Sequence, residues 1–201
     1  DHCDETPPDE LNVYTDGAFN RPTDQAWSVG GFGVVWVDRD LFLQPLNNNE
    51  IEFGHPHHSR GHLSMHGFLA GNIGSSTRAE LAAGIMAAAS DYCVHIGTDS
   101  QAFKDHAESI IARRGRIDIK QDALGPDGDL WIVFCNIVAA KGPNTICITK
   151  VKGHITDKMI ADGQHTAKDK FFNDNADHVA KQGHLVVPEG ALLDELGALY
   201  E

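Results

Sequence analysis

The order of its strand-like and helix-like segments constrains this chain more than any other feature. Three segments rich in β-branched or alternating apolar residues come first, at 11–15, 30–37 and 62–70, and an Ala-rich helical segment follows at 77–91. Strands at 94–98 and 145–151 then alternate with helices at 100–113, 129–141 and 173–181. This order predicts an α/β domain with a mixed five-stranded sheet, in which an antiparallel meander precedes parallel strands, flanked by helices.

Two segments between these elements lack a clear pattern. Segment 155–172 is polar and stays unassigned, and segment 44–61 is predicted to be a loop. The loop and the strand after it contain His55, His57, His58, His62 and His66. Histidine is a common zinc ligand, but no cysteine pattern accompanies these residues, which favours a polar hairpin loop over a zinc site.

The ends of the chain differ from its centre. Residues 1–10 are acidic and rich in proline, so we expect a disordered segment, followed by one domain at 11–185. Residues 186–201 form a predicted tail, with a short amphipathic helix at 191–200. No apolar run approaches the ~18 residues of a membrane span, so no membrane partner is expected. The four cysteines show no metal-type spacing, which favours reduced thiols and an intracellular location in cytoplasm or nucleus.

The net charge of −13 opposes the binding of nucleic acid, which is a polyanion. However, 12 of the 16 Lys and Arg residues lie between residues 101 and 181. We therefore expect a modest, salt-sensitive affinity for a polyanion, with further binding supplied by a partner domain.

Four acidic residues stand at the ends of predicted strands or on predicted helices. Asp16 ends the first strand, beside Gly17, and Asp99 follows the strand at 94–98. Glu80 lies in the first turn of the Ala-rich helix, and Asp177 lies on the last helix.

Each of the four also has a simpler interpretation. Asp16 fits an ordinary strand-to-turn Asp-Gly, and Asp99 fits a cap for the next helix. Glu80 fits a capping box with Thr77, and Asp177 fits a solvated surface position. If the fold does gather the four, cations must offset their repulsion, and oxygen ligands favour Mg²⁺ or Mn²⁺ over zinc.

The neighbours of these acids carry a family resemblance. The chain resembles the type 1 ribonuclease H family over residues 11–185. The residues of its motifs are most similar to those of ribonuclease H domains in retroelement polyproteins. The matching motifs are Tyr14-Thr15-Asp16-Gly17, Ser76-Thr77-Arg78-Ala79-Glu80-Leu81, Thr98-Asp99-Ser100-Gln101, Val151-Lys152-Gly153-His154, and Asn173-x-x-x-Asp177 followed by Val179-Ala180-Lys181.

The resemblance implies a metal-dependent endoribonuclease that hydrolyses the RNA strand of RNA–DNA hybrids and leaves 5′-phosphate and 3′-hydroxyl ends. It implies two Mg²⁺ ions: Asp16 bridges them, Glu80 and Asp99 complete one site, and Asp177 completes the other. His154 matches a mobile histidine that assists proton handling or product departure, which its near-neutral titration allows. The substrate-binding positions it implies are Gly17, Ser76, Thr77, Gln101 and Asn173.

The chain departs from the family in two places. Roughly a dozen extra residues lie between His154 and Asn173, and the basic stretch at 113–120 holds no aromatic residue. We expect the domain to belong to a larger nucleic-acid-processing protein. The alternatives are a nuclease or integrase of the same superfamily that acts on DNA, and a non-catalytic hybrid-binding domain of a larger polyprotein.

Overall fold

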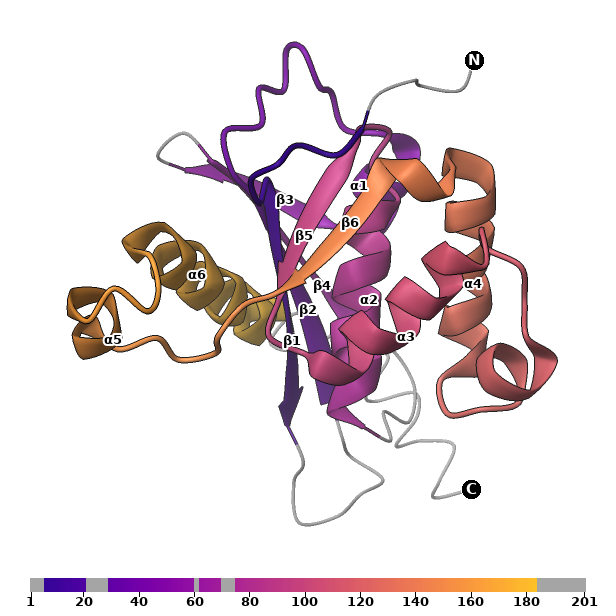
Figure 1. The fold of residues 1–201 in the computed structure, drawn as a ribbon. Coiled ribbons are helices and arrows are strands. Elements are labelled where there is room, and N and C mark those ends of the chain that lie inside the picture. The colour runs from indigo at the N-terminus through magenta and orange to yellow at the C-terminus, as the bar shows by residue number, and fades with distance from the viewer. Residues whose placement is uncertain (1–5, 21–28, 60–61, 70–74, 184–201) are drawn as a thin grey trace, which may run out of the picture.

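A six-stranded mixed sheet forms the centre of this computed structural model, which describes residues 6–20, 29–59, 62–69 and 75–183 (Figure 1). The strands are β1 (Val13–Asn20), β2 (Val29–Trp36), β3 (His55–Ser59), β4 (His62–Leu69), β5 (Val94–Thr98) and β6 (Ile146–Lys150). Their order across the sheet is β3-β4-β2-β1-β5-β6. The pairs β1/β2, β2/β4 and β3/β4 are antiparallel, and β1/β5 and β5/β6 are parallel.

Helices cover both faces of the sheet. They are α1 (Asn48–Phe53), α2 (Ser76–Ala88), α3 (Gln101–Ala112), α4 (Gly128–Lys141), α5 (Asp157–Ala161) and α6 (Ala167–Gly183), with a π turn, η2 (Ile119–Ala123), and a 3-10 turn, η3 (Pro143–Thr145). Helix α6 lies on one face, and α2, α3 and α4 lie on the other (Figure 1).

Period-two alternation divides the core between these faces. Val13, Val34 and Ile96 are fully buried in the larger cluster, which includes α2 and α4. Tyr14 and Val35, each one position further along, are buried in the smaller cluster with Val179 of α6. Successive residues of β1 and β2 therefore serve opposite faces of the sheet.

Gly33 fixes how closely α6 approaches the sheet. A Cβ at this position would collide with the carbonyl oxygen of Ala176 and the main-chain nitrogen of Ala180. Because glycine lacks that atom, the α6 backbone lies directly on β2. This contact sets the position of Asp177, which lies on α6 between the two alanines.

The mixed α/β class is confirmed, but the prediction of a loop at 44–61 is wrong. This stretch forms α1, with a capping box between Asn47 and Glu50, and then β3. Glu50 is fully buried and pairs with buried Arg39, with Nη1–Oε1 at 2.5 Å. Strand β3 contains no strong strand former, so its pairing with β4 overrides local propensity. Pro56 is tolerated because β3 is an edge strand.

Segment 155–172, unassigned from the sequence, is largely helical. The hydroxyl of Thr156 caps α5, and α6 begins at Ala167, six residues before the expected start. Tyr14 holds this extension to β1: its hydroxyl donates a 2.7 Å hydrogen bond to Asp169, and its ring stacks on Phe172. Anchoring contacts from β1 therefore extend the helix beyond its sequence signal.

Several expectations about the ends of the chain lie outside the described residues. These concern the tail at 186–201 with its helix at 191–200, while only residues 6–10 of the N-terminal segment are described. Glu10 there pairs with Lys168 at 2.7 Å. The domain limits stay a prediction.

Of the cysteines, Cys135 is buried and Cys147 is half-buried, and both are free thiols. Within the described part of the chain, no helix has the length and apolar character needed to span a membrane.

Candidate metal centre and nucleic-acid surface

Strand register brings Asp16 and Asp99 together. The parallel ladder between β1 and β5 ends at the pair Thr15 and Thr98, so the two aspartates are the next residues on neighbouring strands. Asp16 does not end its strand, as the sequence predicted, because β1 pairs with β2 as far as Asn20. Only the ladder with β5 ends here, at Thr15, just before Asp16. Beyond that point, a side chain from another element can approach Asp16 and Asp99.

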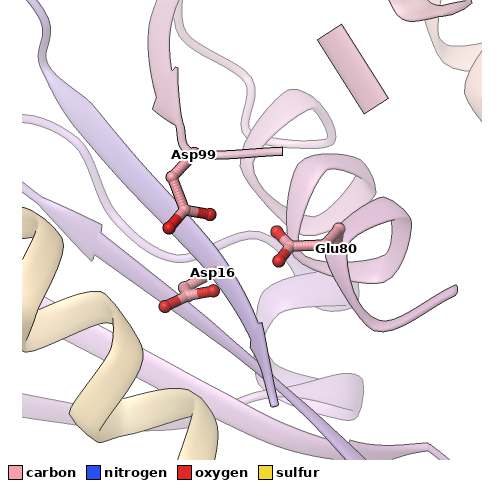
Figure 2. A group of neighbouring side chains, drawn as sticks. All are labelled: Asp16, Glu80 and Asp99. Atoms are coloured by element: carbon pink, nitrogen blue, oxygen red, sulfur yellow. The ribbon is translucent and has the colours of Figure 1, made fainter. Parts of the chain in front are cut away.

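Helix α2 supplies that side chain. The capping-box interpretation of Glu80 is wrong: Ser75 is the N-cap, and no side chain caps α2. Glu80 instead points toward Asp16 and Asp99 (Figure 2). Gly17 allows this, because a Cβ there would collide with the main-chain nitrogen of Glu80 and the carbonyl carbon of Ala79. The absence of a side chain at position 17 lets the start of α2 pack against β1.

The three carboxylates form one cluster. Asp16, Glu80 and Asp99 each offer an oxygen, and these oxygens all lie within 4.8 Å of one another. Burial, followed by the charges of Asp99 and Asp177, raises the pKa of Asp16 to about 7. Burial, followed by Asp16 and Asp99, also raises the pKa of Glu80. Without a cation, the cluster therefore opposes its own ionisation.

An unpaired atom supports the fit of a metal ion to this cluster. Glu80 Oε2 is buried and has no hydrogen-bond donor. A proton shared with a neighbouring carboxylate or a cation can satisfy it, since the ionised side chains of Asp16 and Asp99 beside it can only accept hydrogen bonds. Three carboxylates form a hard, oxygen-only donor set of the type that Mg²⁺ and Mn²⁺ prefer.

The loop after β6 closes one side of the cluster. A Cβ at Gly153 would collide with Oδ2 of Asp99, so glycine lets this loop lie against the carboxylate. The Nζ of Lys150 hydrogen-bonds the main-chain carbonyl of Asp99. The helix-cap interpretation of Asp99 is wrong, since Ser100 caps α3 through a 3.3 Å bond from the Phe103 amide.

Asp177 and His154 lie around this cluster without joining it. Asp177 is close enough for its charge to raise the pKa of Asp16, but its carboxylate accepts a 2.6 Å bond from Lys181. His154 follows Gly153, is exposed, and has a φ of 53°. Asn173 lies one turn before Asp177 and is buried, with no partner for its Oδ1. Their roles in the site stay predictions.

The other expected substrate-binding residues lie where two helices begin. Ser76 and Thr77 open α2, and Gln101 opens α3, where it donates to Asp105. A pocket of about 590 Å³ extends from Thr77 to Lys120 and Trp131. It connects the start of α2 to the basic segment that precedes α4.

The structure divides the basic stretch at 113–120 into two parts. Arg113 is bound internally, donating two bonds to Asp122 at 2.9 and 2.7 Å, while Arg114, Arg116 and Lys120 are exposed. Sequence analysis missed Asp122, which is fully buried and also hydrogen-bonds His106. No sequence signal distinguishes Asp122, because it lies in a polar stretch. Its partners, His106 on α3 and Arg113 just after α3, come close to it only in the folded chain.

Comparisons with solved structures identify the fold of this chain, while comparisons of its sequence find no match. No protein-family profile and no curated protein matches the chain. The solution structure of the PFV RNase H domain is similar at 21% identity, with 87% of this chain and 94% of that chain covered and a TM-score of 0.56. The crystal structure of prototype foamy virus protease–reverse transcriptase is similar at 20% identity, with 90% of this chain and 22% of that chain covered and a TM-score of 0.56.

A third similar structure is that of the foamy viral protease–reverse transcriptase in complex with dsDNA, at 18% identity, with 87% of this chain and 94% of that chain covered and a TM-score of 0.52. The chain spans about a fifth of the prototype foamy virus protease–reverse transcriptase. Together with the sheet order and the carboxylate cluster, these likenesses bear out the motif resemblance at the level of the fold. The chain has the mixed α/β fold of retroviral ribonuclease H domains.

Proposed function

We propose that this chain is a metal-dependent endoribonuclease that hydrolyses the RNA strand of RNA–DNA hybrids. The observation that carries the proposal is the cluster of Asp16, Glu80 and Asp99, whose oxygens lie within 4.8 Å of one another. A ribonuclease H-type fold supports it, as does the presence of each acid in a motif of that family.

Two ion sites account for the four acids. Asp16, Glu80 and Asp99 would hold one Mg²⁺, and Asp16 with Asp177 would hold the second; Mn²⁺ offers the same chemistry. When bound, the two ions activate the attacking water and stabilise the leaving 3′ oxygen, so the products carry 5′-phosphate and 3′-hydroxyl ends. Four carboxylates balance two divalent ions, so the site can accept a phosphodiester without excess negative charge.

The surrounding residues would position the hybrid. Ser76, Thr77 and Gln101 offer polar side chains to ribose 2′-hydroxyls, the groups that distinguish RNA from DNA. Gly17 and Asn173 are proposed contacts as well. His154, exposed beside Gly153, would exchange a proton near the leaving group, since imidazole titrates near neutral pH.

The setting of the domain is also a proposal. Two of the similar structures are protease–reverse transcriptases, and one was determined in complex with dsDNA. We infer that this domain likewise acts within a larger nucleic-acid-processing protein, which supplies part of the substrate affinity. Free thiols at Cys135 and Cys147 are compatible with an intracellular location.

Substrate choice tests the proposal against its alternatives. We expect cleavage of the RNA strand of a labelled hybrid in Mg²⁺, none in chelator, and none of duplex DNA. Cleavage of duplex DNA alone would indicate a DNA nuclease or integrase, and hybrid binding without cleavage would indicate a non-catalytic domain.

A matched pair of variants on α6 tests the fourth acid. Asp177→Asn should reduce kcat by at least ~100-fold, because it removes a proposed metal ligand. Asp174→Asn is the control, since Asp174 lies on the same helix, is exposed and pairs with Lys170. Equal activity of the two variants would remove Asp177 from the site.

A further inference from the structure

The β3–β4 hairpin gathers histidines on one face of the sheet. The register pairs His55 with His66, His57 with Ser64, and Ser59 with His62. Paired residues of antiparallel strands share a face, and alternate residues of one strand also share it. His55, His57, His62 and His66 therefore lie on the same face. His58, paired with the core residue Leu63, lies on the other.

Helix α6 identifies which face this is. The ring of His62 packs edge-on against Phe171 and Phe172 of α6. A pocket of about 290 Å³ lies between the hairpin and the helix, lined by His57, His62 and Ser64 on one side and by α6 residues including His178 on the other. The histidine face thus borders α6, away from α2 and α4.

Two imidazoles of this face, those of His55 and His57, act on a third, that of His66. The rings of His55 and His66 are directly opposed, with centroids 5.4 Å apart and planes inclined by 32°. His57 follows two residues after His55 on the same strand and face. Burial lowers the pKa of His66, and the charges of His55 and His57 lower it further, which places all three within electrostatic reach of one another.

We propose that His55, His57 and His66 bind a zinc-class divalent ion, with water completing the coordination. Three imidazoles plus a water form a recognised zinc ligand set. The protein supplies only nitrogen ligands, so this site differs in chemistry from the carboxylate cluster. It should therefore discriminate against Mg²⁺. The proposal does not depend on nuclease activity.

Binding needs a side-chain adjustment that the hairpin can make. Among the described residues, only Asp16, Glu80 and Asp99 already have their ligand atoms within 4.8 Å of one another. His55 and His57 are exposed, so their rings can rotate toward His66 without disturbing the core. Strand positions i and i+2 with a third residue on the neighbouring strand hold the three Cβ atoms on one side of a short ladder.

The same site explains what holds β3 in place. His55, Pro56, His57 and His58 are all exposed, so the strand buries no apolar side chain. Its ladder with β4 is otherwise its main attachment to the sheet. A metal ion that joins β3 to β4 would cross-link this edge, and the binding free energy would stabilise the folded chain.

Zn²⁺ titration of the full chain tests the proposal. We expect one equivalent to bind at micromolar concentration and to raise the melting temperature by several degrees, and Co²⁺ to give the visible absorption of a low-coordinate nitrogen site. His55→Gln and His66→Gln should each weaken binding at least ~10-fold. His58→Gln, on the same strand but the other face, should leave binding intact.

Asp16→Asn separates this site from the carboxylate cluster. Zn²⁺ binding that survives this variant and is lost in His55→Gln supports the histidine site. Binding lost in Asp16→Asn overturns the proposal, as does binding retained in the His55→Gln/His66→Gln double variant or no binding below about 100 µM, an affinity too weak for a built zinc site. Far-UV circular dichroism confirms that each variant folds; the histidine side chains are exposed or half-buried, so replacing them leaves the core unchanged.

Discussion

At the scale of single residues, Asp16 makes the stability of the protein depend on pH. Its pKa is raised to about 7, above the usual value for aspartate, so the folded state binds a proton more tightly than the unfolded state does. Ionisation therefore opposes folding, and the free energy of unfolding should fall as the pH rises from about 4 to 7. Above pH 7 the cost is of order 4 kcal/mol.

Asp16→Asn should remove the contribution of Asp16 to this pH dependence, while burial still raises the pKa of Glu80. In chelator, urea unfolding at pH 8 should show the variant more stable than the wild type by about 4 kcal/mol, and at pH 4 the difference should nearly vanish. Millimolar Mg²⁺ should restore the wild type at pH 8, because it binds only the assembled acids. Parallel pH profiles for the two proteins would contradict this account of the cluster.

A second prediction at this scale concerns the contact between Gly153 and Asp99. Gly153→Ala places a Cβ against Oδ2 of Asp99, so the carboxylate or the loop must shift. The Mg²⁺-induced rise in melting temperature should shrink by at least half, while the metal-free melting temperature changes little because the loop is on the surface. Lys158→Ala, exposed on α5, is the control and should keep the full Mg²⁺ response. An unchanged response in Gly153→Ala would show that the loop does not support Asp99.

At the scale of elements, strongly patterned segments could be predicted and tertiary pairings could not. The strand at 94–98 was predicted with its observed bounds, because these bounds depend on local chemistry. Strand β3 was missed, since only its ladder with β4 makes His-Pro-His-His-Ser extended. The early start of α6 was missed for the same reason: its anchor, Tyr14, lies 155 residues from Asp169.

The contact between α6 and β2 can be tested at this scale. Gly33→Ala sets a methyl group against the backbone of Ala176 and Ala180, which cannot rotate away. We expect a loss of about 2 to 4 kcal/mol in the free energy of unfolding. Gly97→Ala is the matched control, because its new methyl meets only side-chain atoms of Leu11 and Tyr14, at 3.0 to 3.2 Å, and a shift of a few tenths of an ångström relieves these contacts. A similar loss in both variants would refute a special role for the α6 contact.

At the scale of the whole molecule, the sheet order explains why the site could be inferred before the structure was known. Asp16, Glu80 and Asp99 are separated by up to 83 residues, yet their motifs implied one cluster, and the β1–β5 register produces it. Each acid alone had a simpler interpretation, and those of Glu80 and Asp99 failed only once the true caps, Ser75 and Ser100, were known. The place of Asp177 depends on the packing of α6, which no local pattern encodes.

The charge distribution of the whole molecule leads to a prediction about salt. The chain carries a net charge of −13, but Arg114 and Lys120 are exposed, and Lys120 lines the pocket beside α2. Each phosphate neutralised by such a residue contributes about 0.9 to the slope of log K against log salt. In an Asp16→Asn background with Mg²⁺, where the hybrid stays intact, Arg114→Ala/Lys120→Ala should lower the slope by about 2. Fluorescence anisotropy from 50 to 200 mM NaCl, about the range over which such contacts weaken, measures this slope.

The control for this experiment lies on the opposite face of the sheet. Lys168 on α6 is half-exposed and pairs with Glu10, so Lys168→Ala should leave the slope unchanged if the hybrid crosses the α2–α4 side. A slope that falls in Lys168→Ala, and not in the double variant, would place the nucleic acid along α6 instead. Because Arg113 pairs with buried Asp122, Arg113→Ala should act differently again, lowering stability by about 3 kcal/mol because a buried carboxylate loses its arginine partner. Salt dependence thus identifies Arg114 and Lys120 as side chains that bind phosphate, and stability identifies Arg113 as the side chain that supports the fold.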